Sequence, residues 1–264
     1  DYIKGVIYFF YDYSMDINHL KQIAAETAVG YLQSGMVVGL GTGSTARFAI
    51  LKIAQLLRDG ALTDIICIPT SKETEELAQS LGIPLTTLKE HPDIDITIDG
   101  ADEVSADLDL IKGGGGALLR EKIVAQASMR NIIITDAGKL SEKLGEKWCI
   151  PIEVIPFALE PEKRFLESIG ATVTTRSSQD GSSFITDEHN LILDARFGVL
   201  QDPASLSVML NERAGIVEHG LFLGIATEVI AAFPGEVVAF QKGSGREMYL
   251  SKLNSVKDEQ QETC

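Results

Sequence analysis

Asp99, Asp102 and Glu103 place three carboxylates within five residues, directly after a run in which isoleucines alternate with polar residues. Carboxylates this close repel one another, so a solvated turn and a metal site are both ordinary explanations. Gly100 favours a sharp turn, with Ala101 inside it, that would send Asp99 and Asp102 into one cleft. There the pair could perform acid–base chemistry. The motif alone leaves these alternatives open.

A run of four glycines follows Lys112, and Glu121 comes five residues after the last of them. Consecutive glycines lose much conformational entropy on folding, so a protein that keeps them usually sets bare amides against a ligand. Lys112 directly precedes Gly113, Gly114 and Gly115, where its charge and the amides could meet an anion. Glu121 lies about one and a half helical turns past the run. It could face the cleft or pair with a base at the surface, and position alone slightly favours the surface.

The segment 39–45, GLGTGST, lies between an expected strand and an expected helix. Glycines let the backbone approach a ligand, and the free amides of a helix start attract an anion. The GxGxxG spacing is incomplete, and no lysine follows the last glycine as in a Walker motif. A tight turn with a Ser or Thr cap is the alternative. The phosphate interpretation uses Thr42, Gly43, Ser44 and Thr45.

The remaining residues that could do chemistry form no constellation. Lys139 ends a turn after a strand and is either a second cation for a phosphate or an ordinary exposed lysine. The three cysteines have no zinc-like spacing, and none of the four histidines has a ligand partner at helical spacing. The sequence therefore predicts no metal site, and the few scattered cysteines predict a reducing cytoplasm.

Strands and helices alternate with short connections up to about Trp148. The strands are expected at 36–40, 65–68, 94–98 and 131–135, and the helices from about 19, 44, 72 and 117. This alternation predicts an α/β fold, a mostly parallel Rossmann-like sheet with helices on both faces. Ligands of such sheets bind beyond the carboxyl ends of the strands. Each motif above follows such an end.

The pattern changes after Trp148. Strands at 152–155 and 172–175, a hairpin of 184–186 with 191–195, and helices over 161–170 and 203–215 predict a small α+β, ferredoxin-like second domain. We expect residues 15–149 and 217–250 to form the catalytic domain and 150–216 a lid or oligomerisation domain. Residues 1–14 are interpreted as a non-native or disordered extension, and the polar tail from Lys252 as loose.

Composition limits the classes of partner. The chain has 264 residues, 45% of them hydrophobic, so it can bury a sizeable core. Its formal net charge of −15 argues against nucleic acids and anionic membrane surfaces as partners. No apolar run approaches the roughly 20 residues that span a bilayer. A small anionic substrate remains compatible, because amides and lysines can hold a phosphate on an acidic protein.

Together the motifs are specific. GLGTGSTA, DITIDGADEV, IKGGGGALLREKIVA, a TDAGKL-like turn and PIEVIPFA occur in the order and close to the spacing of type A ribose-5-phosphate isomerases. ILDARFG and VEHGLFLG also look like that family. The sequence resembles it from about Lys21 to about Ala232, while the last thirty or so residues match poorly. Gly116 stands where many relatives carry Ala, which should loosen the helix start slightly and leave the mechanism intact.

The resemblance implies an aldose–ketose isomerase of the non-oxidative pentose phosphate pathway. Such enzymes interconvert D-ribose 5-phosphate and D-ribulose 5-phosphate through an enediolate, without metal or cofactor. It implies that Glu121 is the general base and that Asp99 and Asp102 help to open the sugar ring and hold its hydroxyls. Lys112, with the amides of 113–115, would stabilise the enediolate.

The resemblance also implies the substrate contacts and the partners. The contact residues are Lys21, Thr42, Gly43, Ser44, Thr45, Gly100, Ala101, Gly113, Gly114, Gly115 and Lys139. The expected partner is a small sugar phosphate. The charge predicts neither nucleic acid nor membrane as a partner, the cysteines predict the cytoplasm, and apolar stretches in the second domain suit a homodimer or homotetramer. Three alternatives must be distinguished from this function. They are a coenzyme A transferase, which would use a glutamate as its nucleophile, a sugar-phosphate deaminase, and a non-enzymatic sugar-phosphate sensor.

Overall fold

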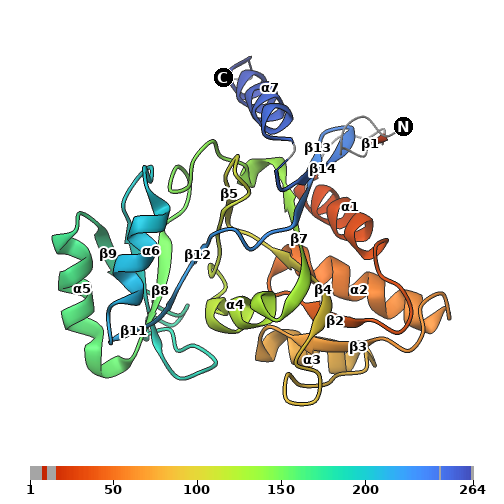
Figure 1. The fold of residues 1–264 in the computed structure, drawn as a ribbon, viewed down its shortest axis with the longest axis horizontal. Coiled ribbons are helices and arrows are strands. Elements are labelled where there is room, and N and C mark those ends of the chain that lie inside the picture. Colours follow the sequence, from red (N-terminus) through yellow and green to blue (C-terminus); the bar gives the residue numbers. More distant parts are fainter. Residues whose placement is uncertain (1–7, 11–15, 244, 263–264) are drawn as a thin grey trace.

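The computed structural model describes residues 8–10, 16–243 and 245–262. Its largest element is a seven-stranded sheet (Figure 1). In spatial order the strands are β1 (Tyr8–Phe10), β14 (Glu236–Gln241), β13 (Glu228–Phe233), β7 (Ser128–Asp136), β4 (Ile94–Gly100), β2 (Val37–Leu40) and β3 (Ile66–Pro69). The five strands from β13 to β3 are parallel, and β14 and β1 add antiparallel pairs.

The sheet is buried on both faces because its central strands are apolar in both directions. Ile132 and Ile134 of β7 share one core with helices α1 (Ile17–Val29) and α2 (Ser44–Arg58). Ile133, between them, faces a second core on the other side. A near-continuous run of β-branched residues is the pattern expected of a parallel strand covered on both faces. Helices α3 (Lys72–Ser80) and α4 (Leu118–Gln126) complete the crossovers.

A second, four-stranded sheet is antiparallel throughout. Its strands are β11 (Ile216–His219), β8 (Ile150–Val154), β10 (Leu191–Arg196) and β9 (Thr172–Thr175), joined by α5 (Leu159–Ser168) and α6 (Pro203–Asn211). The element order β-α-β-β-α-β is that of a ferredoxin-like module. In Figure 1 it lies to the left, with α4 between it and the large sheet. The predicted fold class, a mostly parallel sheet plus a small antiparallel one, is confirmed.

The predicted hairpin between 184–186 and 191–195 is wrong. Strand β10 pairs instead with β9, Leu193 opposite Thr175, and residues 184–186 belong to no strand. Thr186 forms a closed turn with Asn190 through a backbone bond, and both side chains donate to the buried Glu153 carboxylate. These local bonds satisfy the polar groups that a hairpin ladder would have used.

The C-terminal tail expected to be loose is a helix, α7 (Arg246–Glu262). Tyr249 and Leu253 are buried in the second core, the one that Ile133 of β7 faces. The Tyr249 hydroxyl donates to the carbonyls of Val104 and Ser141. Burial of two large side chains fixes the helix despite its polar composition. Of the expected N-terminal extension, only residues 8–10 are described; the rest of 1–14 lies outside the described residues.

A small ribbon carries the chain between the two modules. Strands β5 (Glu103–Val104), β6 (Leu110–Ile111) and β12 (Leu221–Phe222) form it, and short 3-10 helices stand at Ala137–Lys139 and Pro156–Ala158. The Lys112 amide donates to the Gly220 carbonyl, which fixes the return of the chain beside the glycine run. In the part of the chain that the structure describes, no helix is long and apolar enough to cross a membrane.

Candidate active site

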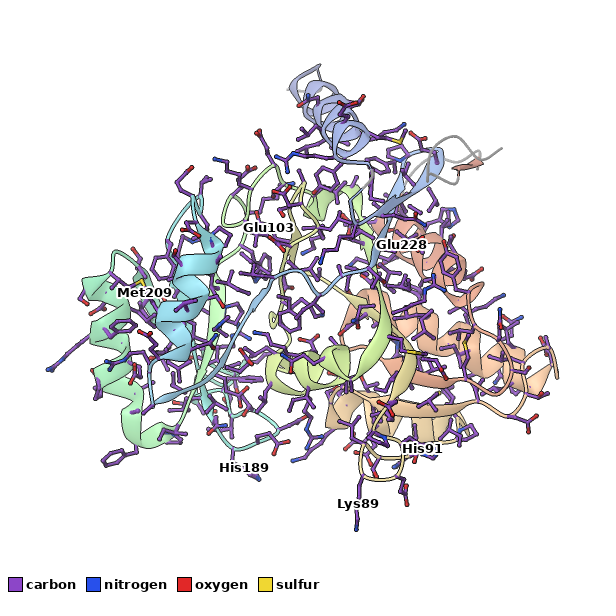
Figure 2. The ribbon with its side chains drawn as sticks, in the orientation of Figure 1. Lys89, His91, Glu103, His189, Met209 and Glu228 are labelled. Carbon is purple, nitrogen blue, oxygen red and sulfur yellow. The ribbon has the colours of Figure 1, made fainter. Side chains whose placement is uncertain are left out.

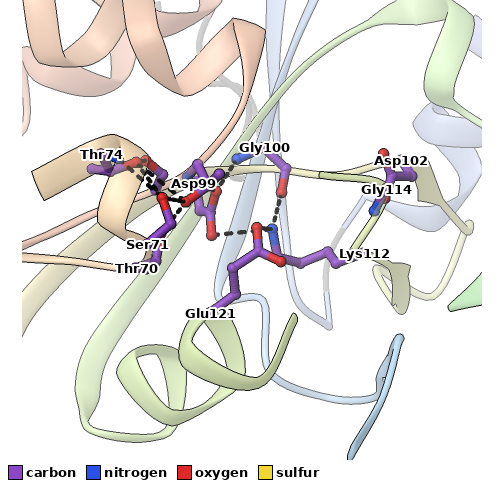
Figure 3. A network of polar contacts seen from close by, with 12 residues as sticks. Thr70, Ser71, Thr74, Asp99, Gly100, Asp102, Lys112, Gly114 and Glu121 are labelled. Carbon is purple, nitrogen blue, oxygen red and sulfur yellow. Dashed lines mark hydrogen bonds and ion pairs between the residues drawn. The ribbon is translucent and has the colours of Figure 1, made fainter. Parts of the chain in front are cut away.

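Lys112 is the centre of a buried charge cluster (Figure 3). Its Nζ lies 3.0 Å from Asp99 Oδ2 and 2.9 Å from Glu121 Oε1, and it also donates to the Gly100 carbonyl. All three ammonium protons therefore have an acceptor. The Lys112 side chain is 4% exposed, so these acceptors replace the water that the charge has lost.

Glu121 comes from the first turn of α4, and only one of its carboxylate oxygens is held. Oε1 accepts from Lys112, whereas Oε2 is buried and has no hydrogen-bond partner among the described residues. The structure thus places Glu121 in the cleft, not at the surface that its position slightly favoured. A carboxylate oxygen left free in a cleft is an available proton acceptor.

The pKa values of Lys112 and Glu121 are set by burial and by the charges of each other and of Asp99. Burial raises the pKa of Glu121 to about 8; Lys112 opposes the shift, and the Asp99 carboxylate adds to it. Burial alone would lower the pKa of Lys112, but the nearby Asp99 and Glu121 carboxylates outweigh it and raise that pKa. Lys112 therefore stays a cation, while Glu121 can change its protonation state near neutral pH.

The two aspartates take different places. Asp99 is buried; its Oδ1 accepts from the Thr42 and Gly100 amides, and its Oδ2 faces Lys112. Asp102 Oδ2 accepts from the Gly114 amide at 2.6 Å, so it ties the acidic turn to the glycine run. A Cβ at Gly114 would lie 2.5 Å from Asp102 Oδ1, which explains why this approach needs glycine.

Glu103 does not share the cleft. It is fully buried, and its oxygens accept from the amides of Gly145, Lys147 and Trp148 on a separate loop. The three carboxylates of the acidic motif therefore point to three different sets of partners. Within the described ranges, no three His, Cys, Asp or Glu side chains gather as ligands of a metal ion would.

The turn before α2 offers its amides to a ligand. The N-cap is Gly43, with φ of 99° and no side chain that could cap the helix, so the first-turn amides have no capping partner. Lys21 Nζ, from α1, donates to Ser44 Oγ at 3.0 Å and brings a positive charge to the same turn. A helix start with a lysine beside it is a favourable place for a phosphate.

A cluster of hydroxyls behind Thr42 was not predicted from the sequence. Thr42 Oγ1 lies 2.7 Å from Thr70 Oγ1, 2.9 Å from Ser71 Oγ and 3.2 Å from Thr74 Oγ1. Thr70 and Ser71 follow the carboxyl end of β3, so their position at a strand end was the signal that could have identified them. The cluster fixes the Thr42 side chain and its loop.

Lys139 also lines the cleft. Its Nζ stands 4.6 Å from the centroid of the Trp148 ring, a cation–π distance, and the turn that carries it is held by Lys147, which donates to the Gly138 and Leu140 carbonyls. Among the described residues the buried Trp148 indole nitrogen has no hydrogen-bond partner, and it is the ring face that contacts Lys139.

One cleft gathers nearly all of the predicted residues. It is lined by Lys21, Thr42, Gly43, Ser44, Thr45, Gly100, Ala101, Asp102, Lys112, Gly113, Gly114, Gly115, Glu121 and Lys139. Asp99, the remaining predicted residue, lies directly behind Lys112. The lining combines three lysines, two carboxylates and a series of backbone amides. It can bind an anion and exchange a proton with it.

Gly116→Ala is expected to destabilise the protein by about 2–4 kcal/mol, the sum of backbone strain and overpacking. Gly116 has φ of +84°, and a Cβ there would lie 2.3 Å from the Phe184 ring. Urea unfolding measures the loss, with Gly170→Ala as the control because Gly170 has φ of +101° and open space around it. Equal losses in the two variants would contradict a steric role for Phe184.

The family model for ribose 5-phosphate isomerase A (phosphoriboisomerase A) matches residues 66–235. A curated relative, ribose-5-phosphate isomerase A of Desulfatibacillum aliphaticivorans, is 62% identical over 213 residues, which cover 81% of this chain and 93% of the relative. The corresponding protein of Chloroflexus aurantiacus is 54% identical over 217 residues, or 82% of this chain and 91% of its own.

Solved structures agree with these sequence matches. A D-ribose-5-phosphate isomerase in complex with phospho-erythronic acid superposes with a TM-score of 0.84 and 37% identity, over 86% of this chain and 100% of that one. The ribose 5-phosphate isomerase of Plasmodium falciparum superposes with a TM-score of 0.83 and 43% identity, over 86% and 99%.

Proposed function

Because this chain belongs to the ribose 5-phosphate isomerase A family, we propose that Glu121 carries the proton in its interconversion of ribose 5-phosphate and ribulose 5-phosphate. The observation that supports this role is the free oxygen of Glu121: Oε2 is buried at the cleft and unpaired, while Lys112 holds Oε1. The base removes the proton from C2 of the open-chain aldose and returns it to C1 of the resulting enediolate, while the proton of the C2 hydroxyl moves to O1, so that the carbonyl passes from C1 to C2. Atoms and electrons balance without a redox partner.

Lys112 and the amides of the glycine run stabilise the negative charge that develops on the sugar oxygens. Removing a proton beside a carbonyl leaves an enediolate, which needs fixed donors in a site shielded from water. Lys112 is a buried cation within hydrogen-bond reach of Glu121. Proton acceptor and oxyanion donor thus sit side by side, as transfer between adjacent carbons requires.

The aspartates divide their roles according to their contacts. Asp102 lines the cleft, so it is the carboxylate that faces the ring oxygen and hydroxyls during ring opening. Asp99 acts through Lys112, because both of its oxygens already have partners. Its negative charge keeps Lys112 protonated and raises the pKa of Glu121.

The phosphate binds at the α2 start and provides binding energy away from the reacting carbons. Ser44 and Thr45 of the uncapped helix start line the cleft, with Lys21 bonded to Ser44, and Lys139 lines the same cleft. Conversion of ribose 5-phosphate to ketose in the presence of EDTA tests the whole proposal. Ribose is the control substrate, because it lacks the phosphate that would bind at the α2 start. Activity abolished by EDTA would contradict a mechanism that needs no metal.

The proposal includes the assembly and the compartment. The proposed catalytic domain is 15–149 with 217–250, and 150–216 is a second domain that joins copies into a homodimer or homotetramer. The second sheet crosses this predicted boundary, because β11 runs to His219. Phe157 is 95% exposed, and Val208 and Met209 of α6 are also exposed, which supports such an interface; Figure 2 labels Met209 beside α6 in this module. Cys67 and Cys149 are unpaired, which supports a reducing cytoplasm.

We expect kcat/KM to fall about tenfold per pH unit below about pH 8 and to be constant above it. Glu121 works as a base only when ionised, and burial raises its pKa to about 8, so activity is lost as the pH falls through that value. The second ionisation of a phosphate monoester lies near 6, so a limb near 8 belongs to the enzyme. A flat profile from pH 6 to pH 9 would contradict this base.

A further inference from the structure

Arg176 connects the antiparallel sheet to the glycine run, although it follows β9 and no motif marks it. Its Nη1 donates to the Gly113 carbonyl at 2.7 Å and to the Gly114 carbonyl at 3.1 Å. A second edge of its guanidinium forms a bidentate pair with Asp194 of β10, in which Nε lies 2.9 Å from Oδ2 and Nη2 is bonded to Oδ1. Its side chain is 14% exposed.

The Gly113–Gly114 peptide is gripped from both sides. Arg176 binds its carbonyl, and Asp102 accepts from its amide at 2.6 Å. In a trans peptide the carbonyl and the amide point in opposite directions. Binding of the carbonyl on one side therefore presents the amide to the Asp102 side, which lines the cleft.

The next peptide is held from one side only. Arg176 binds the Gly114 carbonyl, so the Gly115 amide of the same peptide points away from Arg176. Gly115 lines the cleft, and within the described residues its amide has no hydrogen-bond partner. A donor oriented into the cleft and left unpaired is available to a developing oxyanion.

Glycines cannot maintain this orientation by themselves. Without a Cβ, each peptide of the run can rotate at little steric cost, and fixing it must be enforced by contacts outside the run. Phe184, which lies 5.9 Å from the Arg176 guanidinium and against Gly116, closes the same side.

We propose that Arg176 is a positioning residue for the isomerase reaction: by holding the two glycine carbonyls, it directs the Gly114 amide to Asp102 and leaves the Gly115 amide to stabilise the enediolate. Arg176 does not line the cleft and touches no substrate position. The inference rests on the proposed function, because it concerns the same oxyanion. It assigns part of the active-site geometry to the second sheet.

Arg176→Met tests this proposal, with Arg213→Met as the matched control. Arg213 makes a similar two-point pair with Glu162 in the same module and has no contact with the glycine run. We expect Arg176→Met to lower kcat about 30-fold or more with KM changed less than threefold, since misaligned oxyanion donors cost the transition state. The inhibition constant of phospho-erythronic acid, whose carboxylate resembles the enediolate oxygens, should rise in parallel, while that of inorganic phosphate should not.

Arg176→Lys gives a second measurement if the methionine variant does not fold. A lysine can keep one carbonyl or Asp194 but not the whole set, so kcat should fall about tenfold with KM retained. Unchanged kcat in the folded variants, a change in KM alone, or an equal loss in Arg213→Met would overturn the proposal. Glu121→Gln, assayed in the same experiment, distinguishes failure of the proposed function from failure of this inference. An active Glu121→Gln enzyme contradicts the proposed function. An inactive Glu121→Gln enzyme together with a fully active Arg176→Met enzyme contradicts only the role of Arg176.

Discussion

Glu121→Gln is expected to fold normally and to lose about 10³-fold or more of its kcat for ribose 5-phosphate, the upper range for a general base. Glutamine keeps the shape of the side chain, and its carbonyl oxygen can still accept from Lys112, as Glu121 Oε1 does. It cannot take a proton from C2. Ketose formation and exchange of the C2 proton with solvent deuterium should both disappear, since one residue performs both.

The same variant should be no less stable than the wild type, which separates a catalytic role from a structural one. The pKa of Glu121 is raised from its ordinary value to about 8, so the folded state binds a proton that the unfolded state has released. Wild-type stability therefore falls as the pH rises from about 4.5 to 8, and the glutamine variant lacks this fall. Thermal unfolding at pH 6 and pH 8 measures the difference.

Glu153→Gln is the control for this experiment. Glu153 is also a buried glutamate, but its side-chain bonds in the described structure go to Thr186 and Asn190, which do not line the cleft. Its substitution should leave kcat within about threefold of the wild type. A fully active Glu121→Gln enzyme would refute the assignment of the base, and an equal loss in both variants would attribute the effect to general damage.

Lys112→Met is expected to have the largest combined effect, a loss of about 10²–10³-fold in kcat together with about 3–5 kcal/mol of stability. Lys112 is the only cation bonded to Asp99 and Glu121 in the described structure, so its removal leaves two buried carboxylates without a counter-charge. Removing one partner of a buried ion pair is costly for this reason.

The stability loss should depend on pH in a definite direction. Without Lys112, protonation of Glu121 relieves its repulsion with Asp99, so Lys112→Met should lose less stability at pH 5 than at pH 8. Urea unfolding at both pH values measures this. Lys143→Met, at an exposed lysine that bonds Gln201, should change little at either pH. A pH-independent loss would show that packing, not charge, explains the effect.

The sequence predicted the architecture and the cleft because both depend on strand ends. Thr42 and Lys139 follow β2 and β7, and Asp99 lies at the end of β4, so these three share the edge where the carboxyl ends of parallel strands meet. Lys112 differs, because it follows β6 of the small antiparallel ribbon. This physical rule brings distant motifs together without any knowledge of the packing. The family resemblance then supplied the roles, which stay predictions until the variants above are measured.

What the sequence did not reveal depends on contacts between elements far apart in the chain. Arg176 follows a strand that looks like any other, and it contacts Gly113 only because the fold brings the residue after β9 next to the glycine run after β6. The tail has a polar composition, yet it forms a helix that the Tyr249 hydroxyl attaches to the carbonyls of Val104 and Ser141. The failed hairpin at Thr186 has the same origin, because Glu153 offers bonds that a local pattern does not show.

The backbone bond between Lys112 and Gly220 has a consequence for synthesis of the protein. Gly220 is translated about a hundred residues after Lys112, and at roughly 5–20 residues per second this interval lasts about 5–20 s. During this interval the nascent chain carries its acidic turn and glycine run without the bond between Lys112 and Gly220. A ribosome stalled before residue 220 would therefore display a sheet that has begun to fold but no competent catalyst, and this late closure is the stage at which a chaperone has most to protect.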